Sequence, residues 1–359
     1  MWPTRPPYPW RAISPIPQSF SPDSLSYSYF DLQFSRDVKN ESEIWIMNTW
    51  AIKKADTFNH SIYVYRTGDG TWSEVPSILE DTDAEIVHLY QAKDGTVWAA
   101  ASTEVGHAYG YYAEIQETPY VFAVFDEEKR NFTSIEFPQE VPLGPVDFDG
   151  EEFWIFEKDG PIYSLNPHTL EITEYLDPRK SELADFIVLP KNLVKNDGSL
   201  AFSKDGSFYF LASTPREYPI EIDVFHFSPK TDSLRIITPG FVGSPSYISG
   251  LLVDQFDNLW MSDIGWMDKD GNWYHQLIRS PVFITSYMEG QSFDWEYPEI
   301  VLESSNGVLW FSSTNGMVFM NPKDGNWCWF TTYRSEMIED AQHNLWMTID
   351  GELYKSPLE

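Results

Sequence analysis

The stretch Asn306-Gly-Val-Leu-Trp-Phe-Ser-Ser-Thr314 contains a turn signal, a short run of strand formers around one tryptophan, and a hydroxyl-bearing end. An Asn-Gly pair before such a run is typical of a tight turn that leads into a β-strand. Related copies recur along the chain, and the aromatic residues that mark the seven copies are Trp45, Trp98, Trp154, Tyr209, Trp260, Trp310 and Trp346. The first six lie about 50 to 56 residues apart and the last follows after about 36, a periodicity typical of propellers and solenoids.

Each repeat reads as four antiparallel β-strands, with the marked aromatic residue on the second strand. Asp-Gly or Asn-Gly pairs precede several of the marked strands, and polar and apolar residues alternate in stretches such as 221–227. Both features favour short antiparallel strands. The sequence therefore predicts an all-β protein, one seven-bladed β-propeller over residues 1–359, with a helical turn allowed only at 181–185.

The last repeat stops after its third strand, at 351–355. An open sheet edge would invite aggregation. The Pro-rich segment 1–27 looks irregular except for residues 10–14, which suit one short strand. We expect this strand to pair with the strand that contains Leu353, completing the seventh sheet and joining the two ends of the chain.

The marked aromatic residues are expected to form the core. A side chain wedged between two neighbouring sheets buries about 150–250 Å². Replacing Trp310 with alanine should therefore lower the free energy of unfolding by about 3–5 kcal/mol, through lost burial and a cavity.

The chain is strongly acidic, with 55 acidic and 24 basic residues and a formal charge of −31. A field of this sign repels phosphate backbones and anionic headgroups, so we expect neither nucleic acid nor membrane insertion. Hydrophobic residues make up 42% of the chain and aromatic residues 16%, which is enough for a large core.

The single cysteine, Cys328, excludes an intrachain disulfide and a multi-cysteine metal site. No apolar run approaches the roughly 18 residues that a membrane span needs. The first residues lack the apolar core of a secretory signal. We therefore expect a cytoplasmic protein if Met1 is the native start, and an exported or cell-surface protein if a leader has been removed.

The repeat resembles that of the two-component-regulator propeller family. The shared pattern is Asp-Gly-x-Leu/Val-Trp-apolar-x-Ser/Thr followed by Gly-x-apolar-Tyr/Phe, and it is clearest over 306–321 and 343–354. In that family such repeats build sensor or interaction propellers. The resemblance implies a seven-bladed propeller with a sensing or binding role.

The repeat is also more distantly similar to that of the streptogramin lyase propellers, which use His and Glu with a metal at the mouth of the ring. Here the histidines are scattered, and none follows a marked strand in the pattern that a paired base would need: His60, His88, His107, His168, His226, His275 and His343. Motifs of zinc proteases, phosphate-binding loops and nucleophile elbows are absent from the sequence. We therefore expect no catalytic residues.

Two acidic stretches, Asp268-Lys-Asp-Gly271 and Asp147-Phe-Asp-Gly150, have part of the spacing of a calcium loop. Both lack the distal bidentate glutamate of a complete loop. Ordinary turns are the favoured interpretation. We expect no cofactor, and bound calcium is the alternative.

The two faces of the predicted propeller differ in their connections. Turns from first to second and from third to fourth strands are short, whereas the remaining connections, which emerge on the other face, are long and rich in aromatic and acidic residues. Long loops on a rigid scaffold commonly carry function. The candidate binding residues on this long-loop face are Trp50, Tyr109, Tyr112, Tyr218, Trp266, Trp295, Tyr297, Asp263 and Asp294.

Exposed aromatic side chains with neighbouring acids suit a partner protein, a peptide or a carbohydrate. The favoured hypothesis is thus a non-catalytic binding propeller, a sensor or interaction module. Two alternatives stay open. One is a lyase or hydrolase with its site at the mouth of the central channel, and the other is a structural subunit of a larger assembly.

Overall fold

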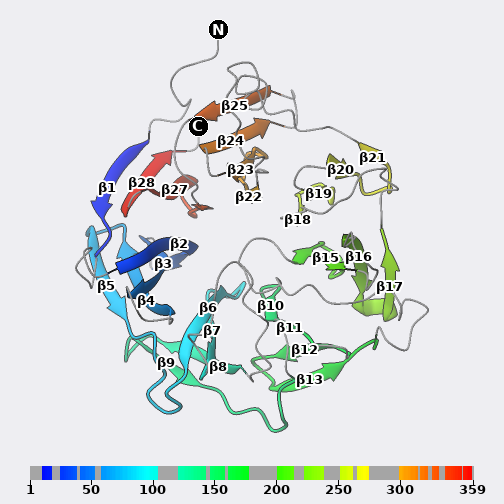
Figure 1. Cartoon of the computed structure of the whole chain (residues 1–359), viewed down its shortest axis with the longest axis horizontal. Coiled ribbons are helices and arrows are strands. Elements are labelled where there is room, and N and C mark those ends of the chain that lie inside the picture. The colour runs from blue at the N-terminus through cyan, green and yellow to red at the C-terminus, as the bar shows by residue number, and fades with distance from the viewer. Residues whose placement is uncertain are drawn as a thin grey trace. The chain divides into compact units, whose positions relative to one another are not determined.

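The computed structural model describes the strands of all seven repeats. The described residues are 10–17, 25–38, 41–52, 58–103, 120–142, 146–157, 161–177, 200–213, 222–237, 251–261, 265–274, 299–313, 316–321, 326–330, 336–349 and 351–357. They form seven four-stranded antiparallel sheets (Figure 1). Seven such sheets make a seven-bladed β-propeller, so the predicted fold class is confirmed. The helical turn expected at 181–185 lies outside the described residues.

The chain divides into two compact units. The described residues within 10–157, 163–173 and 336–357 belong to the terminal unit, and those within 161–162 and 174–330 belong to the middle unit.

Four sheets belong wholly or mainly to the terminal unit. Their strands, in sheet order, are β1(Arg11–Pro15), β28(Glu352–Pro357), β27(Asn344–Ile349) and β26(Met337–Glu339); β2(Leu25–Val38), β3(Glu41–Ile52), β4(Phe58–Arg66) and β5(Thr71–Val75); β6(Glu85–Gln91), β7(Val97–Ser102), β8(Val121–Asp126) and β9(Asn131–Ser134); and β10(Val146–Phe148), β11(Phe153–Phe156), β12(Ile162–Asn166) and β13(Glu171–Glu174).

Three sheets belong to the middle unit. Their strands are β14(Leu200–Phe202), β15(Phe208–Ser213), β16(Ile222–Ser228) and β17(Ser233–Ile236); β18(Leu251–Val253), β19(Leu259–Met261), β20(Gly265–Met267) and β21(Trp273–Tyr274); and β22(Glu299–Glu303), β23(Leu309–Ser313), β24(Gly316–Asn321) and β25(Asn326–Phe330). One 3₁₀ turn, η4(Pro229–Thr231), joins β16 to β17.

The N-terminal strand completes the last sheet, as the sequence predicts. Strand β1 pairs antiparallel with β28, with Ser14 opposite Leu353. The Ile16 N–H extends the contact by donating to the Gly351 carbonyl at 2.8 Å. The Trp72 indole of β5 donates to Ser14 Oγ at 2.9 Å, which also fastens β1 to the neighbouring sheet.

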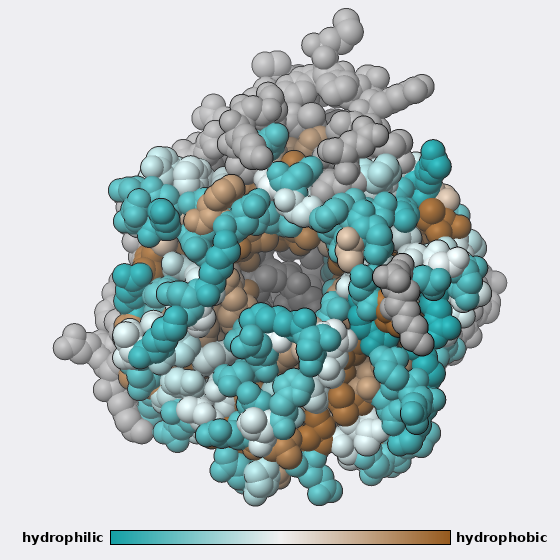
Figure 2. Space-filling model, turned by 180° about the vertical axis from the view of Figure 1, so that it is seen from behind, coloured by the Kyte–Doolittle hydropathy of each residue, from teal (hydrophilic) through white to brown (hydrophobic). Residues whose placement is uncertain are grey.

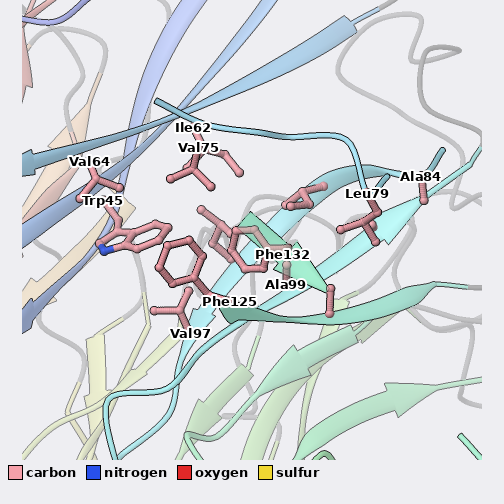
Figure 3. Packing of buried hydrophobic residues seen from close by; sticks show 14 residues of the cluster. Trp45, Ile62, Val64, Val75, Leu79, Ala84, Val97, Ala99, Phe125 and Phe132 are labelled. Atoms are coloured by element: carbon pink, nitrogen blue, oxygen red, sulfur yellow. The ribbon is translucent and has the colours of Figure 1, made fainter. Parts of the chain in front are cut away.

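The marked aromatic residues are buried, with exposed fractions of 0–9%. Trp45 lies in one cluster with Phe125 and Phe132 of the following sheet (Figure 3). Trp98 is grouped in the same way with Phe153 of β11, and Trp260 with residues of β22 and β23. The aromatic side chain of one sheet thus fills the gap to the next, which is the core position that the sequence predicts.

Five of the turns that lead into the marked strands share one backbone geometry. In the β14–β15 turn, the Ser203 N–H donates to the Ser207 carbonyl and the Gly206 N–H donates to the Ser203 carbonyl. The same two bonds recur before Trp98, Trp260, Trp310 and Trp346, and in these five turns the residue three before the aromatic has a positive φ. Glycine fills that position at Gly95, Gly206 and Gly307, whereas Asp257 and His343 fill it elsewhere. Glycine is the frequent choice because a positive φ strains other residues.

Side chains at the start of these turns accept hydrogen bonds from the marked indoles. Trp260 and Trp346 each donate at 2.8 Å to an aspartate six residues earlier. Trp310 donates to Ser304 Oγ at 3.3 Å. Trp98 has Ala92 at this position, and its buried Nε1–H has no acceptor among the described residues. A buried N–H without an acceptor destabilises the folded state.

Replacing Ala92 with serine is expected to raise the free energy of unfolding by about 0.5–1.5 kcal/mol, because the introduced hydroxyl would accept from the Trp98 indole. The backbone should tolerate the change, since Ala92 starts a turn with the same backbone bonds as Ser304. Urea unfolding followed by far-UV circular dichroism measures it. The reciprocal Ser304→Ala should lose a similar amount, and a loss of stability in Ala92→Ser would contradict the assignment.

Candidate functional site

Only part of the predicted binding set falls in the described structure. The side chain of Trp266 is described, and Trp50 is described as a backbone position in β3. The remaining seven candidates lie outside the described residues: Tyr109, Tyr112, Tyr218, Trp295, Tyr297, Asp263 and Asp294. Their binding role stays a prediction.

Each sheet has two different ends. We call the end at which the first and second strands and the third and fourth strands are joined the short-turn end, and the opposite end the long-loop end. The β2–β5 sheet is extended at its long-loop end, because β2 has 14 residues and β3 has 12, against 4 to 7 in β6–β9. The extra length continues the pairing to Leu25 opposite Ile52, with a register shift between Leu25 and Tyr27.

This extension corrects two expectations. Strand β2 begins at Leu25, although the segment up to residue 27 was expected to be irregular outside 10–14. Trp50 was expected in a loop, but it lies in β3 between Ser28 of β2 and Asn59 of β4. The alternation of serine and tyrosine in Ser-Tyr-Ser-Tyr29 supports a strand, and the nearby prolines obscured that signal.

A histidine–glutamate pair lies beside this extension, at the long-loop end of the same sheet. Glu85 Oε1, at the start of β6, accepts the His60 backbone N–H at 2.5 Å and lies 3.3 Å from His60 Nδ1. Ser77 Oγ donates to the His60 carbonyl at 2.8 Å. The three residues connect β4 to the chain that leads into β6. The sequence does not indicate this pair, because the two residues are 25 positions apart and belong to no motif.

Trp266 lies in β20, not in the loop where it was expected. It faces Trp260 across one strand pair and Tyr274 across the other. The rings are stacked, with centroids 5.4 Å apart for Trp260 and 4.2 Å apart for Tyr274. We call these three residues the aromatic row. It starts in the core at Trp260 and ends at Tyr274, which is 44% exposed.

The turn between β20 and β21 holds the outer end of this row. Asp268 accepts from the Asp270 and Asn272 backbone N–H groups and the Asn272 amide, and Asp268 Oδ2 accepts from the Tyr274 hydroxyl at 3.1 Å. The hydrogen bonds from Asn272 lower the pKa of Asp268. The bond to Asp268 and the charge of that carboxylate raise the pKa of Tyr274.

The same turn chemistry explains the stretches with partial calcium-loop spacing. Asp149 accepts the backbone N–H groups of Glu151 and Glu152 and the Trp154 indole. Asp268 holds its own turn in a similar way. In the part of the chain that the structure describes, no group of three or more His, Cys, Asp or Glu side chains is placed to hold a metal ion. The expectation of no cofactor stays a prediction, with bound calcium as its alternative.

One serine, histidine and aspartate do meet in the β14–β17 sheet. Ser207 Oγ donates to Asp205 Oδ1 at 2.6 Å and lies 3.0 Å from His226 Nε2, while Arg235 Nε donates to His226 Nδ1 at 3.2 Å. Burial, with the Arg235 charge, lowers the pKa of His226. In a hydrolase triad the carboxylate orients the histidine. Here the carboxylate binds the serine, a guanidinium binds the histidine, and Ser207 is buried, so this group stabilises the sheet.

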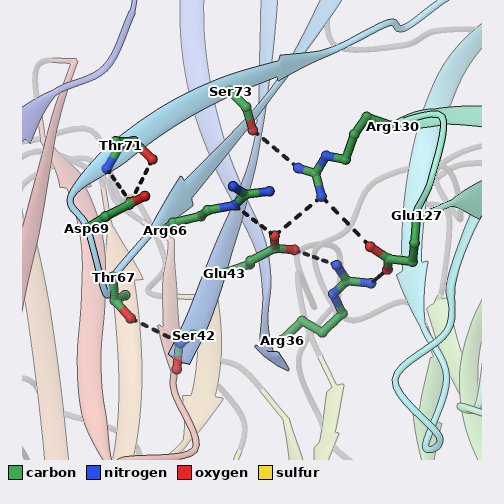
Figure 4. A network of polar contacts seen from close by, with 10 residues as sticks. All are labelled: Arg36, Ser42, Glu43, Arg66, Thr67, Asp69, Thr71, Ser73, Glu127 and Arg130. Carbon is green, nitrogen blue, oxygen red and sulfur yellow. Dashed lines mark hydrogen bonds and ion pairs between the residues drawn. The ribbon is translucent and has the colours of Figure 1, made fainter. Parts of the chain in front are cut away.

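A network of ion pairs joins two sheets of the terminal unit at their short-turn ends (Figure 4). Glu43 is 5% exposed and accepts from Arg36 at 2.5 Å, from Arg66 at 3.3 Å and from Arg130 at 3.4 Å. Glu127, in the β8–β9 turn, also pairs with Arg36. Burial opposes ionisation of Glu43, but its arginine partners lower its pKa overall. We assign this carboxylate, which is enclosed by three guanidiniums, a structural role in joining the two sheets.

On the face shown in Figure 2 the coloured residues are mostly hydrophilic, and apolar residues reach the surface in narrow groups between them. Large apolar side chains that are well exposed among the described residues include Ile78, Phe256 and Tyr274. No helix in the described part of the chain has the length and apolarity that crossing a membrane requires.

No protein-family model matches this chain, and no curated protein matches it. Among solved structures it is similar to the extracellular domain of a protein described as a hybrid two-component system from B. thetaiotaomicron, with 13% identity and a TM-score of 0.58 over 98% of this chain and 42% of that one. A second such extracellular domain has 12% identity and a TM-score of 0.52 over 96% of this chain and 42% of that one. YCF48 from Cyanidioschyzon merolae has 14% identity and a TM-score of 0.54 over 97% and 98%.

These similarities confirm the resemblance at the level of the fold. The fold of this chain is a β-propeller like those of the two extracellular domains. The chain spans about two fifths of the length of those two-component chains. Fold alone does not fix function, which depends on the site that the fold carries.

Proposed function

We propose that this chain is a non-catalytic binding propeller, a sensor or interaction module. Its long-loop face captures a partner protein, a peptide or a carbohydrate. We also propose that it works outside the cytoplasm, and the extracellular placement of two similar propellers supports this.

The observation that carries the proposal is the extension of the β2–β5 sheet at its long-loop end. Strands β2 and β3 stay paired beyond Trp45 as far as Leu25 and Ile52. The extended hairpin provides a hydrogen-bonded backbone at the long-loop end of the sheet. Such a scaffold lowers the entropy lost on binding.

The polar residues near this extension support binding more than catalysis. His60 and Glu85 bind each other, and the Glu85 carboxylate also accepts a backbone N–H. Their contacts fix the connection between β5 and β6 beside the extension. A preformed surface with restrained connections suits recognition of a ligand.

The test uses a printed oligosaccharide array and a cellulose-bound peptide array as probes. The wild-type chain is expected to bind one probe class selectively. Trp50→Ala should weaken that binding by about tenfold or more, as expected for an aromatic residue central to an interface. The melting temperature should change little.

Trp72→Ala is the matched control. It removes a tryptophan at the short-turn end of the same sheet, so binding should persist. Binding that survives both Trp50→Ala and Trp295→Ala, or that is lost equally in Trp72→Ala, would overturn the proposed face.

A further inference from the structure

We propose a second site, independent of the long-loop face: the outer end of the aromatic row, at Tyr274, binds an arginine side chain of a partner protein. One face of the Tyr274 ring lies on Trp266, at a centroid distance of 4.2 Å and an interplanar angle of 15°. The residue is 44% exposed, so part of its ring is accessible to a ligand.

The surroundings of this ring favour a cation. Asp268 lies beside it and accepts its hydroxyl at 3.1 Å, and Asp270 is exposed in the same turn. The negative face of an aromatic ring attracts a guanidinium or ammonium group, and nearby carboxylates strengthen the attraction. The formal charge of −31 for the whole chain attracts the same kind of partner from a distance.

The chain uses this chemistry within its other sheets. Lys355 Nζ lies 4.9 Å from the centre of the Trp346 ring. Arg36 lies over Trp45 at 5.6 Å, and Arg130 lies over Phe125 at 5.1 Å. Both arginines also pair with one buried carboxylate, that of Glu43. The Glu43 network thus shows that this chain already holds guanidinium groups against a ring and a carboxylate together.

The β18–β21 sheet differs at the corresponding place. In the β14–β17 sheet, the row Tyr209 and His226 ends at Arg235. In the β18–β21 sheet, Tyr274 takes the position of Arg235. Tyr274, with Asp268 and Asp270 nearby, thus lies at the position where the β14–β17 sheet has the cation Arg235. We infer that a partner supplies the guanidinium here.

Arginine is favoured over lysine because its planar guanidinium stacks on a ring and also donates two parallel hydrogen bonds to a carboxylate. Tyr274 offers the stacking surface, and the exposed Asp270 of the same turn offers an acceptor. The partner is thus an exposed, arginine-bearing segment of another protein.

The probe is a blocked tri-arginine peptide, titrated into the full chain by isothermal calorimetry at low salt. A tri-citrulline peptide of the same length, which keeps the shape and loses the charge, is the ligand control. Tri-arginine should bind, and tri-citrulline should bind at least about fivefold more weakly.

Three variants locate the site. Tyr274→Ala should weaken tri-arginine binding about fivefold or more, and Asp270→Asn should weaken it by a smaller factor. Phe256→Ala removes another exposed ring from the same sheet and should leave the affinity unchanged. Equal binding of the two peptides, or unchanged affinity in Tyr274→Ala with the fold intact by circular dichroism, would overturn the proposal. Neither result bears on the long-loop face, whose test uses Trp50.

Discussion

Replacing Trp45 with alanine is expected to lower the free energy of unfolding by about 3–5 kcal/mol. The indole is fully buried. It stacks on Phe34 of its own sheet at 5.6 Å and meets Phe125 of the next sheet edge-on at 5.0 Å. Alanine would leave a cavity between two sheets that their own hydrogen bonds hold in place, so the gap would close only in part. Urea unfolding followed by far-UV circular dichroism measures the loss.

Trp45→Phe separates ring packing from the indole N–H. The Trp45 Nε1–H has no acceptor among the described residues, so phenylalanine removes an unsatisfied donor while it keeps most of the ring. The expected loss is under about 1.5 kcal/mol. Ile78→Ala, at an exposed apolar side chain, should change stability by no more than about 0.5 kcal/mol. If Trp45→Ala lowered the free energy of unfolding no more than Ile78→Ala, that result would contradict the role of Trp45 in filling the gap between two sheets.

The fold was predictable because its signals are local and repeated. Gly206 and Gly307 occupy a turn position with positive φ. Because glycine favours this conformation, its presence in the sequence indicates such a turn. Trp310 follows three residues after Gly307 at a buried strand position. The pairing of β1 with β28 was predictable for a different reason, since the last repeat lacks one strand and a sheet edge needs a partner.

The candidate site was harder to predict because its residues are defined by contacts and by strand length. Trp266 looked like a loop residue because β20 contains only three residues, too few for a visible alternation. His60 and Glu85 lie on strands of two different sheets, and the sequence around one residue does not indicate that it contacts the other. The repeat period of the sequence identifies the core residues. Which residues are exposed at a site depends on where each strand ends, and the period does not give that.

Replacing Glu43 with glutamine is expected to lower the free energy of unfolding by about 3 kcal/mol, as for other buried ion pairs that lose one member. Glu43 and Arg36 are 5% and 6% exposed, so water cannot replace the lost charge. Arg66 and Arg130 would then face Arg36 with Glu127 as the nearest remaining carboxylate of the network. Chemical unfolding at pH 7 measures the effect.

Glu127→Gln is the matched control, because Glu127 belongs to the same network but is 56% exposed. Its loss should be about 0–1 kcal/mol, as for surface ion pairs. The double variant Glu43→Leu with Arg36→Met should recover part of the stability lost in Glu43→Gln, since apolar side chains avoid burying unpaired charge. Equal losses in Glu43→Gln and Glu127→Gln would show that burial does not set the strength of this network.

The dependence of the free energy of unfolding on pH below 4.5 provides an independent test of the role of Glu43. Its arginine partners lower its pKa in the folded chain below the ordinary value of 4.5. Between the two pKa values the unfolded chain binds more protons, so this contribution is complete above pH 4.5 and is lost as the pH falls through the folded pKa. Glu43→Gln lacks the titrating group, so its stability should fall less steeply than that of the wild type below pH 4.5. An identical slope in both chains would mean that other carboxylates account for the acid sensitivity, and that the three arginines hold Glu43 less tightly than their distances indicate.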